Sequence, residues 1–360
     1  MASRLETKIQ DSLARGEYYE AHQIYRTIYN RENAAKKFDS VLALLERGIN
    51  NMLEVKQFGS ALDLAELYAD TLQASKAPPT DATIAKISKI YSQLPRNSTD
   101  SERPSSEDRR TRFVSKLITW SQNVATTKRE TKRGLAKLHA GLAAVLRHEN
   151  SLEEARKHYM LADQPLELAE VIVDMQQLDD SPHEVDLFPA LVAFQLICLR
   201  RVEVAGKFLS NYCRLHPKIV TEAQPYPLPL LNYVALLIQA IPKHNQSHFA
   251  LLFEKYETQI VLEPAFRGLI DKIGQMYFGL PPPRAAGAGG LFGNMFQGLL
   301  GGGANQPKKD DSASEDEYAG GEPMDEDAAT EEDKPRSANQ APSSAPPPRG
   351  STMQDMDELD

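Results

Sequence analysis

The chain has 360 residues, of which 25% are charged and 41% hydrophobic, and it carries a formal net charge of −9. It has two cysteines, no Cys-x-x-Cys pair and no basic-then-apolar start, which argues against a disulfide-stabilised fold and a secretory signal and favours a cytosolic setting. The longest apolar-rich stretches, 187–199 and 227–241, are shorter than the roughly 20 residues of a membrane-spanning helix, so no direct membrane insertion is expected.

From residue 3 to about residue 278, apolar residues recur at helical spacing and almost nowhere alternate with polar ones, which predicts an all-α body. Gly, Pro and polar turn residues divide this body into about fourteen helices. The predicted helices span 3–15, 17–31, 35–53, 58–74, 80–93, 107–123, 131–147, 151–162, 165–177, 183–199, 202–214, 227–241, 246–260 and 262–278.

The first helices contain a repeat. Tyr18, Ala21, Tyr25 and Ile28 stand at offsets 0, 3, 7 and 10, and large and small residues recur at these offsets 20 and 40 positions later. Such alternation lets neighbouring helices pack closely. It predicts a right-handed solenoid of antiparallel, tetratricopeptide-like helix pairs over residues 1–280, although the tetratricopeptide period of about 34 residues is not sustained. An irregular helical bundle is the alternative.

Polar aromatic and arginine side chains crowd the second predicted helix. Tyr18, Tyr25 and Ile28 fit its core-facing stripe, which leaves for the outer face Tyr19, His22, Arg26, Asn30 and Arg31. Because Tyr and Arg concentrate binding energy at protein interfaces, this outer face is a candidate partner-binding surface.

Residues 109–137 contain nine basic side chains and one acidic one, Glu130. Such a stretch suits an acidic partner, the chain's own acidic C-terminal end, or nucleic acid. It lacks interleaved aromatic residues, because Phe113 and Trp120 are spaced as core residues. A solvated basic face is therefore favoured, and no nucleic acid is expected as a partner.

Helical periodicity is interrupted at 218–229 and is replaced after residue 280 by Gly-rich and then acidic sequence. Residues 218–229 contain three prolines and no helical period, which predicts a loop or a small extended excursion. Residues 281–306 form a Gly-rich segment with a short amphipathic helix, expected to dock back on the solenoid or to bind a partner. Residues 301–360 carry a net charge of −11, and the stretch 307–360 is predicted to be a disordered acidic tail.

No motif predicts catalysis. His244 and His248 stand four residues apart, but nothing acidic completes a metal site. Cys198 and Cys213 lie in apolar helix stripes, and the Gly-rich run 287–290 follows three prolines where a phosphate-binding loop would follow a strand. The sequence predicts a binding protein that is not an enzyme, with no metal and no cofactor.

The run from Gly16 to Ile28 (GEYYEAHQIYRTI), followed by Asn30 and Arg31, resembles the N-terminal signature of the Golgi-to-ER traffic protein four family. Segments within 56–64, 152–161 and 296–302 resemble further family positions in the same order. The resemblance spans about residues 3–302. The connection at 218–229 is shorter than the β-hairpin insertion found in some family members.

The resemblance implies a helical-solenoid adaptor that targets tail-anchored membrane proteins to the ER after translation. Its N-terminal half, about 1–150, would bind a dimeric targeting ATPase. Its C-terminal half, about 151–280, would hold a ubiquitin-like-domain protein that recruits a client-carrying co-chaperone. Carried over by position, the ATPase-facing candidates are Tyr19, His22, Arg26, Asn30, Arg31, Lys56 and Asp63.

Candidates for the second partner rest on apolar character and chain position. They are Tyr226, Leu230, Tyr233, Leu237, Phe292, Met295, Phe296 and Leu299. The alternative function is a scaffold subunit of a proteasome-lid-like assembly. Such subunits commonly end in a winged-helix module, whereas this chain ends in a Gly-rich segment and an acidic tail.

Overall fold

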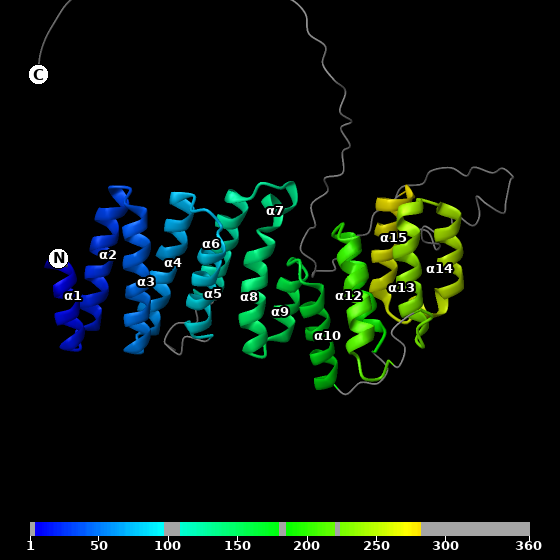
Figure 1. Ribbon diagram of the computed structural model, residues 1–360, viewed down its shortest axis with the longest axis horizontal. Coiled ribbons are helices and arrows are strands. Elements are labelled where there is room, and N and C mark those ends of the chain that lie inside the picture. Colours follow the sequence, from blue (N-terminus) through cyan, green and yellow to red (C-terminus); the bar gives the residue numbers. More distant parts are fainter. Residues whose placement is uncertain (1–3, 97–108, 180–184, 220–223, 282–360) are drawn as a thin grey trace, which may run out of the picture. The chain divides into compact units, whose positions relative to one another are not determined.

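The computed structural model describes residues 4–96, 109–179, 185–219 and 224–281. These residues form fifteen α-helices and one short 3₁₀-helix, with no strand among them, which confirms the predicted all-α fold (Figure 1). All of them belong to the compact unit Met1–Gly302, and the second unit, Gly303–Asp360, lies outside the described residues, as does the predicted boundary at 306.

The helices follow one another with short connections. They are α1 (Arg4–Ala14), α2 (Tyr18–Ala34), α3 (Phe38–Glu54), α4 (Phe58–Ser75), α5 (Asp81–Gln93), α6 (Arg109–Val124), α7 (Lys128–Arg133), α8 (Ala136–His148), α9 (Leu152–Tyr159), α10 (Pro165–Asp179), α11 (Leu187–Cys198), α12 (Val202–Leu215), α13 (Pro229–Ala240), η1 (Ile241–Lys243), α14 (Gln246–Ile260) and α15 (Pro264–Phe278).

Four turns near the start of the chain share one backbone geometry. Gly16, Lys36, Lys56 and Lys76 each follow a helix and have a φ between 49° and 76°. The amide of each, and the amide of the next residue, donate to carbonyl oxygens in the preceding helix at 2.8–3.2 Å. This is the hydrogen-bonded C-terminal turn that glycine favours. The 20-residue spacing seen in the sequence is therefore a structural repeat of one helix and one turn.

Replacing Lys36 or Lys76 with glycine should raise the free energy of unfolding by about 0.5–1 kcal/mol, because glycine adopts this left-handed conformation without a Cβ clash. Urea unfolding followed by circular dichroism measures the change. Glycine at Lys89, an exposed position inside α5, should instead lower stability by about 1 kcal/mol. Destabilisation at the turn positions as well would contradict the prediction.

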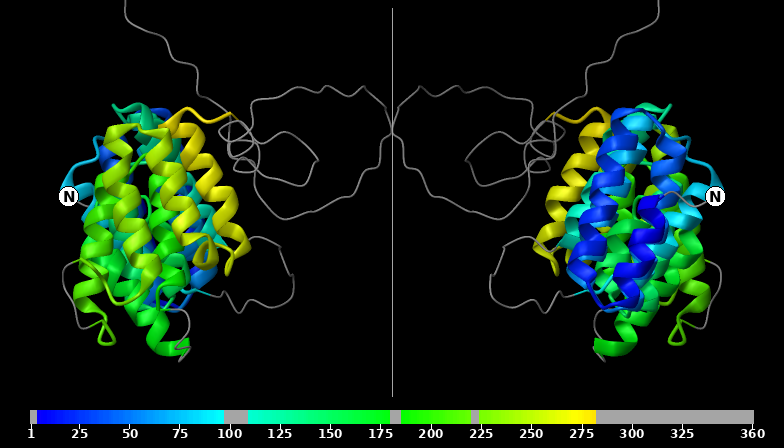
Figure 2. Two further views of the ribbon diagram at one scale, coloured as in Figure 1. Left: turned by 90° about the vertical axis from the view of Figure 1, so that its right-hand side faces the viewer. Right: turned by 90° about the vertical axis from the view of Figure 1, so that its left-hand side faces the viewer.

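The N-terminal helices pack in two layers. Helices α2, α4 and α6 contact one another in turn, and α3, α5 and α8 do the same. Consecutive helices run in opposite directions, as the predicted stack of antiparallel pairs requires (Figures 1 and 2). Small residues permit the close approach: Ala21 and Ala61 are fully buried, and a Cβ on Gly48 would lie 2.9 Å from Leu64 Cδ1. The layering brings α2, α4 and α6 side by side.

The prediction of one helix over 131–147 is wrong at its start. The chain forms the short helix α7 first, and α8 begins only at Ala136. Thr127 caps α7, because its Oγ1 accepts a hydrogen bond from the amide of Glu130 at 3.2 Å. Gly134 then interrupts the helical path with a φ of 90°. The other predicted helices differ from the observed ones by at most four residues at either end.

The connection from α12 to α13 has no strand among its described residues, and residues 220–223 lie outside them. Asn232 holds the last part of this connection in place. Its Oδ1 accepts from the amide of Tyr226, and its Nδ2 donates to the Tyr226 carbonyl, each at 2.7 Å. Phe113 and Trp120 are fully buried, which confirms that they are core residues.

Candidate partner-binding surfaces

The N-terminal candidate surface begins on one side of α2. Tyr19, His22, Arg26 and Asn30 stand at offsets 0, 3, 7 and 11, which aligns them along the helix. Tyr19 is 78% exposed although it is a large aromatic residue, and Arg26, Asn30 and the adjacent Arg31 are also exposed. Exposed tyrosine and arginine side chains on one rigid helix suit a protein interface.

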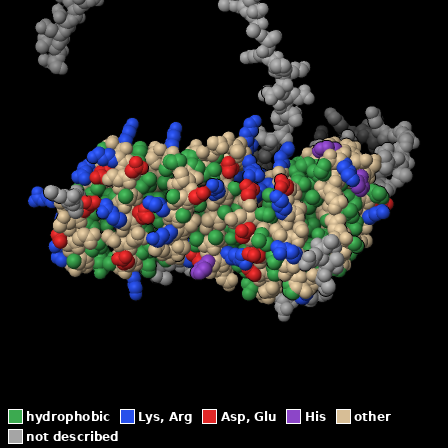
Figure 3. Space-filling model, in the orientation of Figure 1, with side chains coloured by type: hydrophobic (Ala, Val, Ile, Leu, Met, Phe, Trp, Pro, Cys, Tyr) green, Lys and Arg blue, Asp and Glu red, His purple; other side chains and the backbone are tan. Residues whose placement is uncertain are grey.

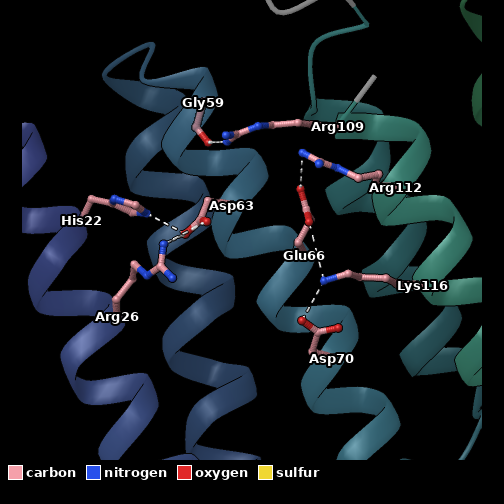
Figure 4. Close-up of polar contacts among 9 residues, drawn as sticks. All are labelled: His22, Arg26, Gly59, Asp63, Glu66, Asp70, Arg109, Arg112 and Lys116. Atoms are coloured by element: carbon pink, nitrogen blue, oxygen red, sulfur yellow. Dashed lines mark hydrogen bonds and ion pairs between the residues drawn. The ribbon is translucent and has the colours of Figure 1, made fainter. Parts of the chain in front are cut away.

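Two of these residues contact α4. The His22 Nε2 atom lies 2.9 Å from Asp63 Oδ2, and Arg26 Nη1 donates to Oδ1 and Oδ2 of Asp63 at 3.2 and 3.4 Å (Figure 4). The structure thus brings three of the predicted residues together, although they are 37 to 41 positions apart in sequence. His22 itself is only 8% exposed. The prediction that it lies on the outer face is wrong, because α4 packs beside it.

The surroundings of Asp63 keep its carboxylate charged. Burial is the largest influence and by itself raises the pKa of Asp63. The hydrogen bond with His22 and the positive charges of Arg26 and Arg109 outweigh burial, so the pKa of Asp63 is lower than its ordinary value. The side chain stays 25% exposed. Asp63 therefore presents a fixed negative charge at the surface between α2 and α4.

The same surface continues from α4 to α6 through ion pairs that the sequence analysis missed. Glu66 lies 3.5 Å from the Arg112 Nη2 atom and 3.6 Å from the Lys116 Nζ atom. Lys116 also pairs with Asp70 at 2.8 Å (Figure 4). These contacts join α4 to α6 in the way that Asp63 joins α4 to α2.

The sequence does hold a signal for this arrangement. Helix α4 carries three acids at offsets 0, 3 and 7, and α6 carries three bases at the same offsets, namely Asp63, Glu66 and Asp70 against Arg109, Arg112 and Lys116. Residues at these offsets share one face of a helix. Matching stripes of opposite charge on two helices of one layer predict that those faces meet. We define the polar column as these six residues with His22 and Arg26.

Lys56 stands apart from the other predicted residues. It is exposed in the turn between α3 and α4, where its φ is 58°. Seven positions separate it from Asp63, which is about two turns of helix. Its position in a repeated turn gives Lys56 a conformational role in addition to any role in binding.

The basic stretch 109–137 does not form a continuous positive surface. Five of its bases pair with acids from other helices or turns, namely Arg110 with Glu149, Arg112 with Glu66, Lys116 with Asp70, Arg129 with Asp163 and Lys137 with Asp81. On the face drawn in Figure 3, basic and acidic side chains lie interspersed. This neutralisation weighs against a nucleic-acid site, which needs clustered, unpaired bases.

The C-terminal candidates are mostly core residues. Leu230, Tyr233 and Leu237 of α13 are at most 1% exposed. The ring of Tyr233 packs edge-on against Phe194 of α11, with ring centroids 5.9 Å apart. Helix α13 is apolar on nearly all sides and contacts α11, α12 and α14, which explains the burial. The prediction that these three side chains form an exposed partner surface is corrected accordingly.

The remaining C-terminal candidates differ in position. Tyr226 is partly exposed in the connection before α13. Four candidates lie outside the described residues, namely Phe292, Met295, Phe296 and Leu299. An exposed apolar pair that no sequence pattern predicts lies in the turn between α14 and α15, where Val261 is 63% and Leu262 69% exposed. Adjacent exposed aliphatic residues of this kind suit a protein partner.

The buried hydroxyl of Tyr233 is expected to lower the stability of the fold. Its side chain is fully buried, and its hydroxyl has no hydrogen-bond partner among the described residues. An unsatisfied buried polar group costs about 1–3 kcal/mol. Tyr233→Phe should therefore leave stability unchanged or raise it by about 1 kcal/mol or more, as measured by thermal and urea unfolding. The matched change Tyr212→Phe should be destabilising, because the Tyr212 hydroxyl donates to the Val185 carbonyl at 2.7 Å.

Within the described ranges, no group of three or more His, Cys, Asp or Glu side chains is placed to hold a metal ion. The described helices are each too short or too polar to cross a bilayer. Cys198 and Cys213 are buried, as their place in apolar helix stripes indicates, and burial raises the pKa of each thiol to about 11. Thiols in this state are poor nucleophiles at neutral pH.

The chain is similar in sequence to one protein family over most of its length. The family model described as Golgi to ER traffic protein 4 matches residues 35–300. The Golgi to ER traffic protein 4 homolog of Oryzias latipes is 33% identical over 300 residues, covering 83% of this chain and 88% of that protein. The homolog of Homo sapiens is 30% identical over 298 residues, covering 83% and 86%.

A solved structure has the same fold. The crystal structure of C. therm. Get4 superimposes with a TM-score of 0.68 at 24% sequence identity, covering 86% of this chain and 99% of that one. At this level of identity the likeness concerns the path of the helices alone. It agrees with the stack of antiparallel helices described above.

Proposed function

Because the chain belongs to the Golgi to ER traffic protein 4 family, we propose that it is a cytosolic adaptor in the targeting of tail-anchored membrane proteins to the ER. In this role it bridges a dimeric targeting ATPase and a ubiquitin-like-domain protein that recruits a co-chaperone. The protein itself performs no catalysis. Its contribution is to present two binding surfaces on one stack of helices.

The polar column supports the first half of the proposal. Its members Arg26 and Asp63 are held in position by contacts between α2 and α4, and the exposed Tyr19 lies on the same side of α2 as Arg26. Charged groups that are held in place before binding lose little side-chain entropy when a partner arrives. The single observation that carries the assignment is the His22–Asp63–Arg26 cluster at the surface of the N-terminal half.

The second surface is proposed for the C-terminal half. The exposed side chains of Val261, Leu262 and Leu251 on and after α14, together with Tyr226, offer apolar contact area there. They replace the buried residues of α13 in the proposal. Because these residues lie in and beside α13 and α14, remote in sequence from α2 and α4, a change at the polar column should leave this second contact intact.

The test uses three charge variants of the full chain and two purified partners, the ATP-bound targeting ATPase and the ubiquitin-like protein. Arg26→Glu and Asp63→Lys each place like charges together in the column. Each should weaken ATPase binding by about tenfold or more, equivalent to about 1.4 kcal/mol, with unchanged binding of the second partner. Isothermal titration calorimetry measures both affinities.

The double variant Arg26→Glu, Asp63→Lys restores an internal ion pair with its polarity reversed. It should fold with wild-type helicity, because the pair between the two positions is restored. It should still bind the ATPase weakly, because the partner meets a negative charge at position 26 and a positive charge at position 63. Lys207→Glu, a charge reversal on an exposed side chain of α12, is the matched control and should bind as wild type does. Wild-type ATPase affinity in all three column variants would overturn the proposal.

A further inference from the structure

A small cavity in the middle of the chain is surrounded by arginine side chains. It lies where α7, the turn between α9 and α10, and the start of α12 meet. Its volume is about 10 Å³, room for one water-sized atom, and its walls are formed by Arg129, Glu130, Arg133, Gly134, Ala136, Leu161 and Arg201. Three guanidinium groups from two separate parts of the chain therefore face one space.

Arg201 forms the floor of this cavity and is 3% exposed. Its two Nη atoms donate to the carbonyl oxygens of Met160 and Ala162 and to the carboxylate of Asp163. These bonds fix the guanidinium rigidly against the turn between α9 and α10. Its Nε atom is buried and has no hydrogen-bond partner in the described part of the chain. One donor of a fixed, buried cation is thus left unused beside the cavity.

Arg133 is the second unsatisfied cation. Its Nη1 atom is buried without a hydrogen-bond partner, and no ion pair of Arg133 is found among the described residues. Burial, and then the charge of Arg129, lower the pKa of Arg133. The guanidinium of Arg129 is 46% exposed at the cavity and has one acidic contact, Asp163 at 3.2 Å.

The acidic groups nearby do not balance these charges. Asp163 is shared between Arg129 and Arg201. Glu130, which also lines the cavity, is engaged by the N-terminal cap of α7, where its Oε2 accepts from Thr127 Oγ1 at 2.9 Å. The site therefore holds three cations against two carboxylates, of which only Asp163 is paired with the arginines among the described residues, and buried donors are still free. A further anion is what this arrangement lacks.

We propose that the Arg129–Arg133–Arg201 cavity is a binding site for a phosphate group. Guanidinium groups are the preferred partners of phosphate oxygens because their donors match the spacing of those oxygens. A phosphate group carries a charge of about −1.5 to −2 at pH 7 and has three acceptor oxygens, which suits three converging cations better than a carboxylate does. One oxygen enters the cavity toward Arg133 Nη1 and Arg201 Nε, and the others face the more exposed Arg129 at its opening.

The site would serve inorganic phosphate or the phosphate of a phosphorylated peptide, and the experiment separates these sources. The melting temperature and the binding isotherm of the full chain are measured with sodium phosphate, with a phosphoserine peptide and its unphosphorylated form, and with sodium chloride at matched ionic strength. Phosphate in one or both forms should raise the melting temperature saturably, since a ligand that binds only the folded state stabilises it. Tighter binding of the peptide assigns the site to a phosphorylated partner.

Arg133→Gln is the decisive variant, because Arg201 also holds the neighbouring turn and its loss would disturb folding. It should weaken phosphate binding by about tenfold or more, as the loss of a charge-assisted hydrogen bond implies. Without phosphate, the same variant should be at least as stable as wild type, because it removes an unbalanced cation. Lys128→Gln, on the same helix but outside the cavity, removes one charge as a matched control.

Two results would overturn the assignment. The first is equal stabilisation of the wild type by phosphate, phosphopeptide and chloride. The second is an equal loss of phosphate affinity in Lys128→Gln and Arg133→Gln, which would show that only the general positive charge of α7 attracts the anion. Neither result depends on the ATPase or the ubiquitin-like protein, so the site is tested separately from the adaptor role.

Discussion

Arg110→Ala is expected to lower the free energy of unfolding by about 3–5 kcal/mol, because it leaves buried polar groups without their cation. Arg110 is 3% exposed, and its guanidinium donates to both carboxylate oxygens of Glu149, at 2.9 and 2.5 Å. It also donates to the Tyr91 carbonyl at 3.1 Å and lies 4.0 Å from the centre of the Tyr91 ring. One side chain thereby fastens α6 to α5 and to the turn after α8.

Urea unfolding of the variant and of Arg112→Ala measures this effect against a matched control. Arg112 lies on the same helix, but its side chain is 39% exposed and its pair with Glu66 spans 3.5 Å. An exposed ion pair of this kind contributes about 0–1 kcal/mol. If the two alanine variants lost equal stability, the buried pair would have no special role in joining α5, α6 and α8.

Acid should destabilise the protein through a buried histidine pair, and His158→Gln should remove much of the effect. The Nδ1 atoms of His139 and His158 lie 2.8 Å apart, and His139 Nε2 lies 2.7 Å from the Arg133 carbonyl oxygen. That carbonyl can only accept, so Nε2 of His139 carries a proton, and the Nδ1 of a neutral His139 accepts from Nδ1 of His158. The contact is lost when both imidazoles are protonated, because each Nδ1 would then carry a proton and neither could accept.

The direction of the pH dependence follows from the same contacts. Burial and then the charge of His139 lower the pKa of His158 to about 4, and burial is also the main cause that lowers the pKa of His139. In the unfolded chain, the two histidines bind these protons near the ordinary histidine pKa of about 6.5. Stability from the pair is therefore complete above about pH 6.5 and is lost as the pH falls toward 4, with roughly 3 kcal/mol from His158 alone.

Unfolding free energies of wild type and His158→Gln, compared from pH 7.5 to pH 4, give this contribution as a difference. His148→Gln, an exposed histidine at the end of α8, should follow the wild-type curve. If the unfolding free energies of wild type and His158→Gln changed with pH in parallel, His158 would bind protons equally in the folded and the unfolded chain. The prediction would then be wrong.

Most of the helical stack could be predicted because each long helix carries its own apolar stripe and ends in a recognisable turn. The 20-residue period of the first helices was visible in the sequence and corresponds to turns with positive φ. Helix α7 could not be found in this way. Its six residues, KRETKR, include no apolar residue, and the cap of Thr127 and the break at Gly134 define its ends.

The candidate surface was predicted less well, for a different reason. Periodicity shows which side of a helix is apolar, but it does not show which later helix covers a polar residue. His22 is covered by α4, which follows about 40 residues later. Apolar character alone predicts that Tyr233 is available to a partner, whereas α13 is flanked by other helices that cover this side chain.

The polar column has a consequence for any protein that binds there. Asp63, Glu66 and Asp70 already have cationic partners on α2 or α6. A partner protein that binds these carboxylates must replace the Arg and Lys side chains that already pair with them. Ion pairs within the chain are then lost as ion pairs with the partner form, so the net electrostatic gain in binding energy is small. Association of this kind can be rapid and selective while the complex stays short-lived, as the adaptor role proposed above requires.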